Sequence, residues 1–276
     1  MKDSDIRVFF IFLVKFMRPS QEIQTASLYL PYTDKEVKEV GTALKYRQEQ
    51  KFYANAHQYM VIRQRLKSLM QTDPHAGPSG EYHIRSLYFD DINNKALHDK
   101  LGGIRNREKW RIRIYNLQGN RIQLEKKIKR DDYIAKVKEE LSPGLLQSIM
   151  EGDIEALNQP DRPLLYEMYR EMKHRLLRPK VIVDYVREAY IAWTGNVRIT
   201  FDKQLKTGLN ATDLLSRDVA VIPAFDENFV IMEVKYDEYL PEYVHAALQL
   251  EGLKRQSASK YVICRKFIKT SIWEDQ

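Results

Sequence analysis

Charged side chains recur two or four positions apart in several segments of this sequence. The pairs are Glu49/Lys51, Arg111/Arg113, Glu125/Lys127, Arg198/Asp202 and Glu233/Lys235. In a β-strand, residues two positions apart point to the same face, so each pair shares one side of its strand. Apolar residues such as Ile112 and Ile199 occupy neighbouring positions and share the opposite side. The spacing therefore predicts a sheet with one ionic face and one apolar face.

An ionic face of this composition is suited to binding phosphates together with a divalent cation. Guanidinium groups form paired hydrogen bonds with phosphate oxygens, and carboxylates are ligands that hard cations prefer. The sequence has no G-x-x-x-x-G-K-[ST] segment and no His or Cys pair with zinc spacing. These absences argue against a P-loop enzyme and a zinc enzyme.

A simpler interpretation is that the charged pairs form cross-strand salt bridges on a solvated face. For any single strand this is the more frequent explanation. The same spacing recurs in five segments, and this repetition favours a binding surface instead.

The basic run at residues 126–130 is interpreted as a solvated strand end rather than a nucleic-acid site, and only Lys127 is expected on the ionic face.

The pattern of apolar residues and turn signals predicts the secondary structure. Strands are expected at residues 43–53, 82–89, 109–116, 121–129, 180–193, 196–207 and 229–236. Helices are expected at residues 33–40, 93–101, 132–176 and 241–250. A further helix is expected to begin after the cap residue Asn55, with an apolar face of Tyr59, Ile62, Leu66 and Leu69. Leu165, Met168, Tyr169, Met172 and Leu176 form an apolar stripe in the longest of these regions. Residues 118–120 are expected to turn a hairpin.

These elements predict an α+β fold, a closed antiparallel β-barrel of about eight strands decorated by helices. Helices need an apolar surface to pack on, so the ionic face must point inward. Cations on every wall repel one another, and Glu49, Glu125 and Glu233 relieve part of that repulsion. A bound phosphate chain with a divalent cation would relieve the rest. We expect one domain at residues 43–270, preceded by an extension at residues 1–42.

Composition indicates an anionic partner and a reducing environment. Lys and Arg number 45 against 38 Asp and Glu, a net charge of +7. The single cysteine, Cys264, excludes an internal disulfide and is typical of a cytoplasmic protein. The apolar run at residues 6–17 is shorter than the ~20 residues of a spanning helix. A packing helix, a peripheral membrane contact and a start codon placed too far upstream remain open for this run.

Eight segments, in consistent order between about residues 44 and 266, resemble the VTC domain. They read YRQEQKF, IRSLYFDD, KWRIRIYN, LEKK, VDYVR, RITFD, IMEVKY and SASKY, beginning at residues 46, 84, 109, 124, 183, 198, 231 and 257. Each segment alone is a weak signal, but the ordered set is specific. The VTC domain is the polyphosphate polymerase domain of the vacuolar transporter chaperone complex, and it is a member of the CYTH-like triphosphate tunnel metalloenzyme superfamily.

The resemblance implies a tunnel that binds a nucleoside triphosphate with Mn²⁺ or Mg²⁺ and transfers the terminal phosphoryl group of ATP to a growing polyphosphate chain. The implied phosphate-binding residues are Lys51, Arg111, Arg113, Lys127, Arg187, Arg198 and Lys260, assisted by Lys235. Glu233 is the implied main metal ligand. Glu125 and Glu49 are further candidates for the metal.

Two other functions remain compatible with these residues. A hydrolase of the same tunnel class would use a tunnel glutamate to activate water and cleave tripolyphosphate or a nucleoside triphosphate. A non-catalytic polyphosphate-binding module would have the same cations. Nucleic acid is a less suitable ligand because the aromatic residues fall between the charged positions rather than on the same face.

Overall fold

The computed structural model describes residues 38–39, 42–226 and 228–273. The strands are β1 (Lys38–Glu39), β2 (Thr42–Ala43), β3 (Arg47–Asn55), β4 (Gln71–Thr72), β5 (Glu81–Asp90), β6 (Arg107–Tyr115), β7 (Gln118–Arg130), β8 (Tyr133–Leu141), β9 (Arg178–Ala192), β10 (Val197–Thr207), β11 (Ile222–Pro223) and β12 (Phe229–Tyr236). The helices are α2 (Ala56–Leu69), α3 (Lys95–Leu101), α4 (Pro143–Glu151), α5 (Pro163–Arg175), α6 (Glu242–Leu248) and α7 (Lys260–Trp273), with short 3₁₀ turns η1 (Ile154–Leu157) and η2 (Thr194–Asn196).

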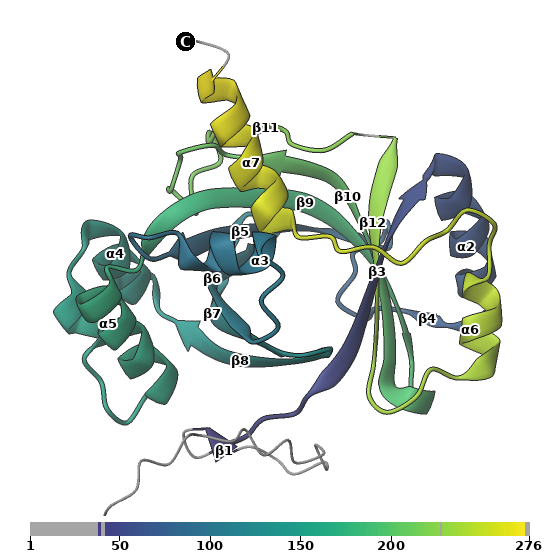
Figure 1. Cartoon of the computed structure of the whole chain (residues 1–276), viewed down its shortest axis with the longest axis horizontal. Helices are drawn as coiled ribbons and strands as arrows, with labels where there is room; N and C mark the ends of the chain where they lie inside the picture. The colour runs from purple at the N-terminus through teal and green to yellow at the C-terminus, as the bar shows by residue number, and fades with distance from the viewer. Residues whose placement is uncertain (1–37, 40–41, 227, 274–276) are drawn as a thin grey trace, which may run out of the picture. The chain divides into compact units, whose positions relative to one another are not determined.

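Eight of these strands close into an antiparallel barrel, as the sequence predicts. The order is β10-β12-β3-β8-β7-β6-β5-β9, and β9 pairs again with β10 to complete the circle (Figure 1). The seam between β3 and β8 is the shortest of these contacts, with Arg47 opposite Ile134 and Gln48 opposite Tyr133. Beyond that seam, the segment before α7 lies along β3, where the Gln256 amide donates to the Lys51 carbonyl at 2.8 Å.

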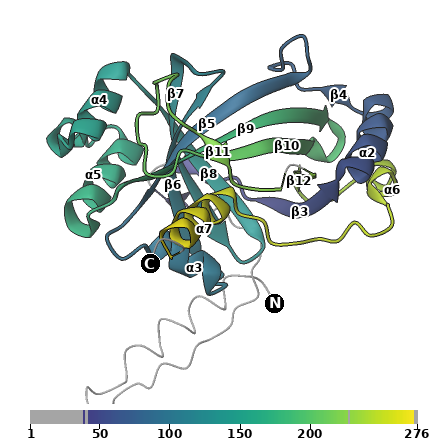
Figure 2. The ribbon, with the colours of Figure 1, turned by 90° about the horizontal axis from the view of Figure 1, so that it is seen from above.

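Two helix pairs cover apolar outer faces of the barrel (Figure 2). On one side, Ile149 of α4 and Leu165 and Met168 of α5 join a cluster with Ile112 of β6 and Leu124 of β7. On another side, α2 and α6 cover a second cluster formed by Ile62, Leu66, Ile199, Met232 and Val244. The apolar positions between the charged ones therefore form the outer surface, as expected.

A third cluster fills part of the barrel interior near α7. Ile84 of β5 and Val183 of β9 pack there with Val262 and Cys264 of α7. Burial raises the pKa of the Cys264 thiol to about 12, so this cysteine is an inert packing group. The ionic cavity occupies the rest of the interior, where it is lined from β3, β5 to β9, β12, α3, α7 and the segment before α7.

The structure corrects the prediction that residues 132–176 are helical throughout. Tyr133–Leu141 forms strand β8, which pairs with β7 from Ile122 opposite Leu141 to Arg130 opposite Tyr133. Its Lys- and Glu-rich composition suits a helix locally, but the complete ladder with β7 outweighs that propensity. α7 is a further element that the sequence interpretation did not include.

The hairpin between β6 and β7 turns two residues earlier than predicted. Tyr115 pairs with Gln118, and Asn116 and Leu117 between them both have positive φ. This is the geometry of a two-residue hairpin turn whose twist matches the flanking strands. Gln118, Gly119 and Asn120 belong to β7 instead of the turn.

Several element boundaries also differ from the predictions. Leu69 of α2 and Leu176, which follows α5, are exposed rather than part of the apolar stripes. Lys38–Glu39 is a strand, which contradicts the end of the helix expected at 33–40. The rest of that helix and the apolar run at 6–17 lie outside the described residues. Within the described part of the chain, no helix has the length and apolar character needed to cross a membrane.

Candidate functional site

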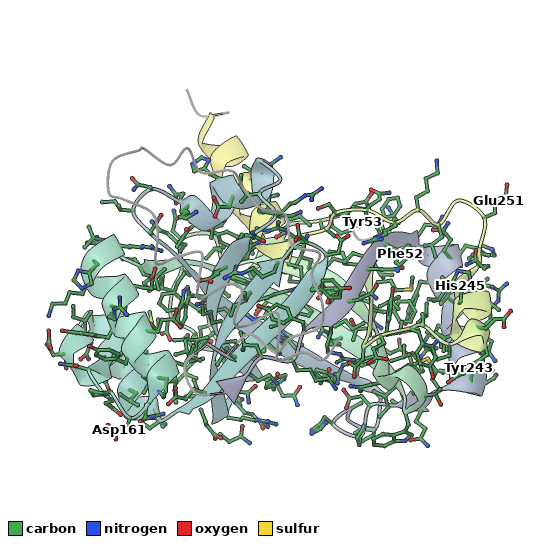
Figure 3. All side chains as sticks on the ribbon, turned by 60° about the horizontal axis from the view of Figure 1, so that its bottom comes forward. Phe52, Tyr53, Asp161, Tyr243, His245 and Glu251 are labelled. Carbon is green, nitrogen blue, oxygen red and sulfur yellow. The ribbon has the colours of Figure 1, made fainter. Side chains whose placement is uncertain are left out.

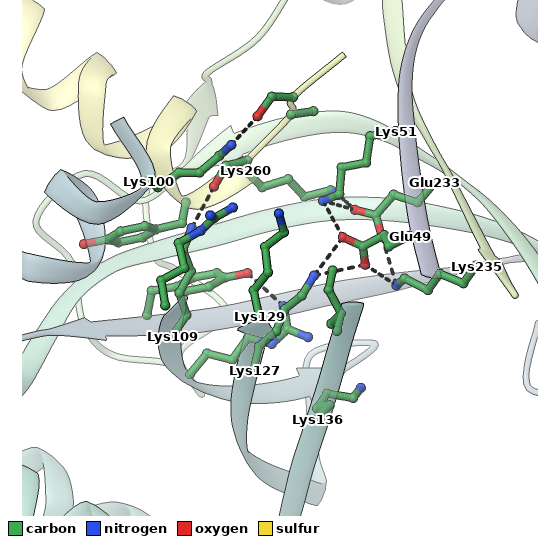
Figure 4. A pocket seen from close by; sticks show the side chains of 18 of the residues that line it. Glu49, Lys51, Lys100, Lys109, Lys127, Lys129, Lys136, Glu233, Lys235 and Lys260 are labelled. Atoms are coloured by element: carbon green, nitrogen blue, oxygen red, sulfur yellow. Dashed lines mark hydrogen bonds and ion pairs between the residues drawn. The ribbon is translucent and has the colours of Figure 1, made fainter. Parts of the chain in front are cut away.

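A cavity of about 480 Å³ inside the barrel brings the predicted cations together (Figure 4). Its basic lining residues are Lys51, Lys100, Arg107, Lys109, Arg111, Arg113, Lys127, Lys129, Lys136, Arg187, Lys235, Arg255 and Lys260. Among the described residues, only Glu49, Asp132 and Glu233 contribute carboxylates to this lining. The interior therefore has a large excess of positive charge and is suited to a polyanion.

Glu233 lies among cations from three elements. Its carboxylate accepts hydrogen bonds from Lys51 at 2.9 Å and Lys260 at 2.8 Å, and Lys235 lies 3.0 Å away. Burial alone would raise the pKa of Glu233, but Lys260 and Lys51 outweigh it and hold the pKa well below its usual range. Glu233 is consequently ionised throughout the physiological pH range.

Glu49 forms the second acidic centre of the cavity. Lys127 donates to it at 2.9 Å, while Lys51 and Lys235 each lie 3.4 Å from a carboxylate oxygen. Burial lowers the pKa of Lys127 to about 7, with Glu49 opposing and Lys51 reinforcing that shift. Lys127 therefore changes charge near neutral pH, unlike an ordinary lysine.

Glu125 organises the arginines of β6 from inside the barrel, on the same face of β7 as Lys127. Arg111 donates to its carboxylate at 2.7 Å, Lys136 donates at 3.0 Å, and Arg113 lies 3.9 Å away. Glu125 has no exposed surface and does not line the cavity. The two arginines also donate to the hydroxyls of Tyr88 and Tyr185, which fix their orientation.

Arg187 and Lys260 are held by a second buried carboxylate, Asp202. Arg187 donates to both oxygens of Asp202, at 2.6 and 2.7 Å, and the Lys260 ammonium lies 2.5 Å from the same group. Burial alone would lower the pKa of Arg187, but Asp202 holds it well above its usual range. Asp202 thus positions two cations for the cavity.

The cavity also contains a group of cations that the sequence interpretation missed. Lys100, Arg107, Lys109 and Lys129 line it without forming an ion pair within the described structure. Lys109 donates to Ser259 at 3.0 Å and lies over the ring of Tyr261, 5.1 Å from its centre. Burial, reinforced by Lys127, places the pKa of Lys109 well below its usual range. Lys129 follows Lys127 by two residues on β7, so both side chains point to the same face, and Lys129 also lines the cavity. The expectation that only Lys127 of the basic run faces inward was therefore wrong.

Arg198 is the predicted phosphate-binding residue that the structure separates from the others. It is not part of the cavity lining. Its guanidinium donates to the carboxylate of Asp73 and to the hydroxyl of Tyr82, at 2.8 Å for the hydroxyl. All the other predicted phosphate-binding residues line the same cavity.

The donor set determines what kind of metal site this chain can form. Among the described residues, no three Asp, Glu, His or Cys side chains group closely enough to hold an ion by themselves. Mg²⁺ commonly binds through one or two carboxylates, with waters and substrate phosphates as the remaining ligands. Glu233 and Glu49 both contact Lys51 and Lys235, so the two carboxylates lie close to each other and suit that arrangement. They are suited to a cation whose remaining ligands are phosphate oxygens and water.

A closed antiparallel barrel with a cation-lined interior defines the triphosphate tunnel fold. The VTC domain family matches residues 46–269, so this chain belongs to the VTC domain family. No curated protein matches the sequence.

The solved structures to which this chain is similar are distant in sequence. A candidate adenylyl cyclase from Hippeastrum, described as having a dominant triphosphatase activity, is 15% identical over 80% of this chain and 96% of its own, with a TM-score of 0.48. The PH1819 protein from Pyrococcus horikoshii OT3 is 15% identical over 76% and 94%, with a TM-score of 0.41. A candidate adenylate cyclase from Bacillus halodurans is 12% identical over 82% and 90%, with a TM-score of 0.39.

Proposed function

We propose that this protein is a metal-dependent polyphosphate polymerase that uses ATP as phosphoryl donor. The observation that carries the proposal is the cavity inside the barrel, whose basic side chains greatly outnumber its carboxylates. A linear polyanion is the ligand that this charge distribution fits, because each phosphate unit can contact several cations at once. Membership of the VTC domain family supports the same assignment.

The proposed reaction breaks the bond between the β,γ-bridging oxygen and the γ-phosphorus of ATP. A terminal oxygen of the acceptor chain forms the new bond to that phosphorus, and ADP leaves with the bridging oxygen. Lys51, Arg187 and Lys260 neutralise the transferring group, and Arg111 and Arg113 hold neighbouring phosphates. The cation, held by Glu233 and Glu49 with phosphate oxygens, would supply further charge neutralisation. Glu125 and Asp202 position the cations.

The protonation states of the carboxylates favour transfer to phosphate over transfer to water. Burial alone would raise the pKa values of both Glu233 and Glu49. Lys260 and Lys51 outweigh burial at Glu233, Lys127 does so at Glu49, and both pKa values are strongly lowered. Strongly lowered pKa values make both groups weak general bases. Water needs a base, whereas the terminal phosphate of a polyphosphate chain is already anionic. A tunnel-class triphosphatase remains the second candidate, since the same cations bind its substrate.

Incubation of the protein with ATP and Mn²⁺ or Mg²⁺ tests the proposal. We expect ADP to accumulate with long phosphate chains that separate on a gel and are degraded by an exopolyphosphatase. Free phosphate without chains would instead establish the triphosphatase. Tripolyphosphate binding without either product would leave a polyphosphate-binding module. The matched control is Glu233→Gln, once circular dichroism shows that it folds as the wild type does. Activity that this variant retains in full would come from a contaminating enzyme.

A further inference from the structure

A row of aromatic side chains lies beside the ionic cavity, in a groove that the phosphate chemistry does not use. Tyr53 of β3 lies 5.2 Å from Phe225, and Phe225 lies 6.4 Å from Phe229, measured between ring centres. Phe229 is 39% exposed, and the other two rings are partly exposed. Other residues that line this groove are Asn55, His57, Gln58, Asp226, Leu250, Glu251, Gly252 and Gln256.

The aromatic row is continuous with the ionic cavity. Gln256 lines both spaces, and its backbone amide is bonded to the carbonyl of Lys51. Tyr53 follows Lys51 by two residues on the same strand, so both side chains leave the same face of β3. Burial raises the pKa of Tyr53, and the positive charges of Lys51 and Lys260 oppose that shift. Figure 3 labels Tyr53 and the neighbouring Phe52. Phe52 packs against the outer cluster under α2 and α6, so its side chain leaves the other face of β3.

We propose that the aromatic row formed by Tyr53, Phe225 and Phe229 binds the base of the nucleoside triphosphate whose phosphates occupy the ionic cavity. The inference rests on the proposed use of a nucleoside triphosphate. Such a molecule has a flat aromatic end joined to an anionic end, and the chain presents an aromatic row adjoining a cationic cavity. Exposed rings bind bases by stacking, which tolerates any base but increases with ring size. We therefore expect purine nucleotides to bind more tightly than pyrimidine nucleotides.

The proposal is tested by comparing two ligands that differ in the base. Calorimetry would measure binding of a non-hydrolysable ATP analogue and of tripolyphosphate to wild-type protein, Phe229→Ala and Phe225→Leu. We expect each variant to lose about tenfold in affinity for the ATP analogue, the effect of one lost stacking contact. Affinity for tripolyphosphate should stay within twofold of the wild-type value, because that ligand has no base.

Tyr243→Ala is a matched control, since Tyr243 is 41% exposed on α6 and does not line the groove. It should leave both affinities unchanged. Phe229→Trp gives an independent readout, since its fluorescence should be quenched by the ATP analogue and not by tripolyphosphate. Equal effects of Phe229→Ala on both ligands, or no effect on either, would overturn the base site while leaving the proposed function intact. If neither ligand binds to the wild-type protein, both the base site and the proposed function are wrong.

Discussion

At the scale of single residues, Glu233 is the group on which metal-dependent turnover should depend most. Glu233→Gln retains the size of the side chain but removes the anionic ligand and one negative charge from the cavity. We expect turnover with Mn²⁺ to fall by roughly 100-fold or more, because several kcal/mol of charge neutralisation by the cation is lost. Metal-free tripolyphosphate binding should strengthen, since Lys51 and Lys260 then lack their shared carboxylate. Unchanged turnover, measured by ADP release, would show that Glu233 is not a ligand.

Lys127 should make phosphate binding depend on pH. Its pKa is about 7 in the free protein, so at pH 7.5 roughly three quarters of the molecules have it neutral. A bound polyanion favours the charged form and raises that pKa. Binding therefore takes up a proton, and affinity should decrease as the pH rises from 7 to 9.

Calorimetry in buffers of different ionisation enthalpy measures that proton uptake directly. Lys127→Arg keeps the positive charge at every pH, so it should bind tripolyphosphate with about 0.75 fewer protons taken up at pH 7.5. Titration of the ligand itself is common to both proteins and cancels in the comparison. Equal proton uptake in the two proteins would contradict the lowered pKa of Lys127.

At the scale of elements, α7 positions Lys260 and depends on one buried hydrogen bond. The Tyr261 hydroxyl donates to Asp90 at 2.5 Å, and Asp90 also accepts the amides of Ala96 and Leu97 at the start of α3. Tyr261→Phe keeps the ring contacts and removes this bond to a charged group, so it should cost about 2 kcal/mol of unfolding free energy. The expected decrease in Tm is roughly 4–8 °C.

The exposed Tyr243→Phe on α6 is the control and should change stability by less than about 0.5 kcal/mol. Urea unfolding followed by circular dichroism measures both variants. A Tyr261→Phe protein as stable as the wild type would mean that apolar packing alone fixes α7. The hydrogen bond between α7 and Asp90 would then have no role in placing Lys260.

The elements also show how far sequence reasoning extends. The alternation of Arg111 and Arg113 with apolar residues is a local property of one strand, so it identified the ionic face and the barrel. Lys136 was missed because β8 is a strand only through its pairing with β7. Lys109 precedes Arg111 by two residues on β6, so the alternation that identified the ionic face applies to it as well. Lys100 lies on helix α3, and no strand spacing records its placement in the cavity. Arg198 occupies a position on its strand that faces the ionic side, but its hydrogen bond to Asp73 keeps it apart from the cations that line the cavity.

At the scale of the whole molecule, the charges that we propose to bind phosphate oppose the folded state. Lys109 is the clearest case, because burial and the nearby Lys127 and Lys51 all disfavour its charged form. Lys109→Met replaces it with an apolar side chain of similar length. Without phosphate at pH 7, we expect this variant to be about 1 kcal/mol more stable than the wild type, a rise in Tm of roughly 2–4 °C.

Bound tripolyphosphate should reverse that order of stability. Ligand binding stabilises the folded state in proportion to the logarithm of the ligand concentration relative to Kd. Lys109→Met should bind about tenfold more weakly, because one cation that contacts the phosphates is lost. Its ligand-induced rise in Tm should therefore be smaller than that of the wild type. Lys67→Met, on the exposed face of α2, should change neither value. Two results would contradict this interpretation: a Lys109→Met protein less stable than the wild type without ligand, or a ligand-induced rise in Tm equal to that of the wild type. Either would mean that the charge of Lys109 does not both destabilise the folded state and strengthen phosphate binding.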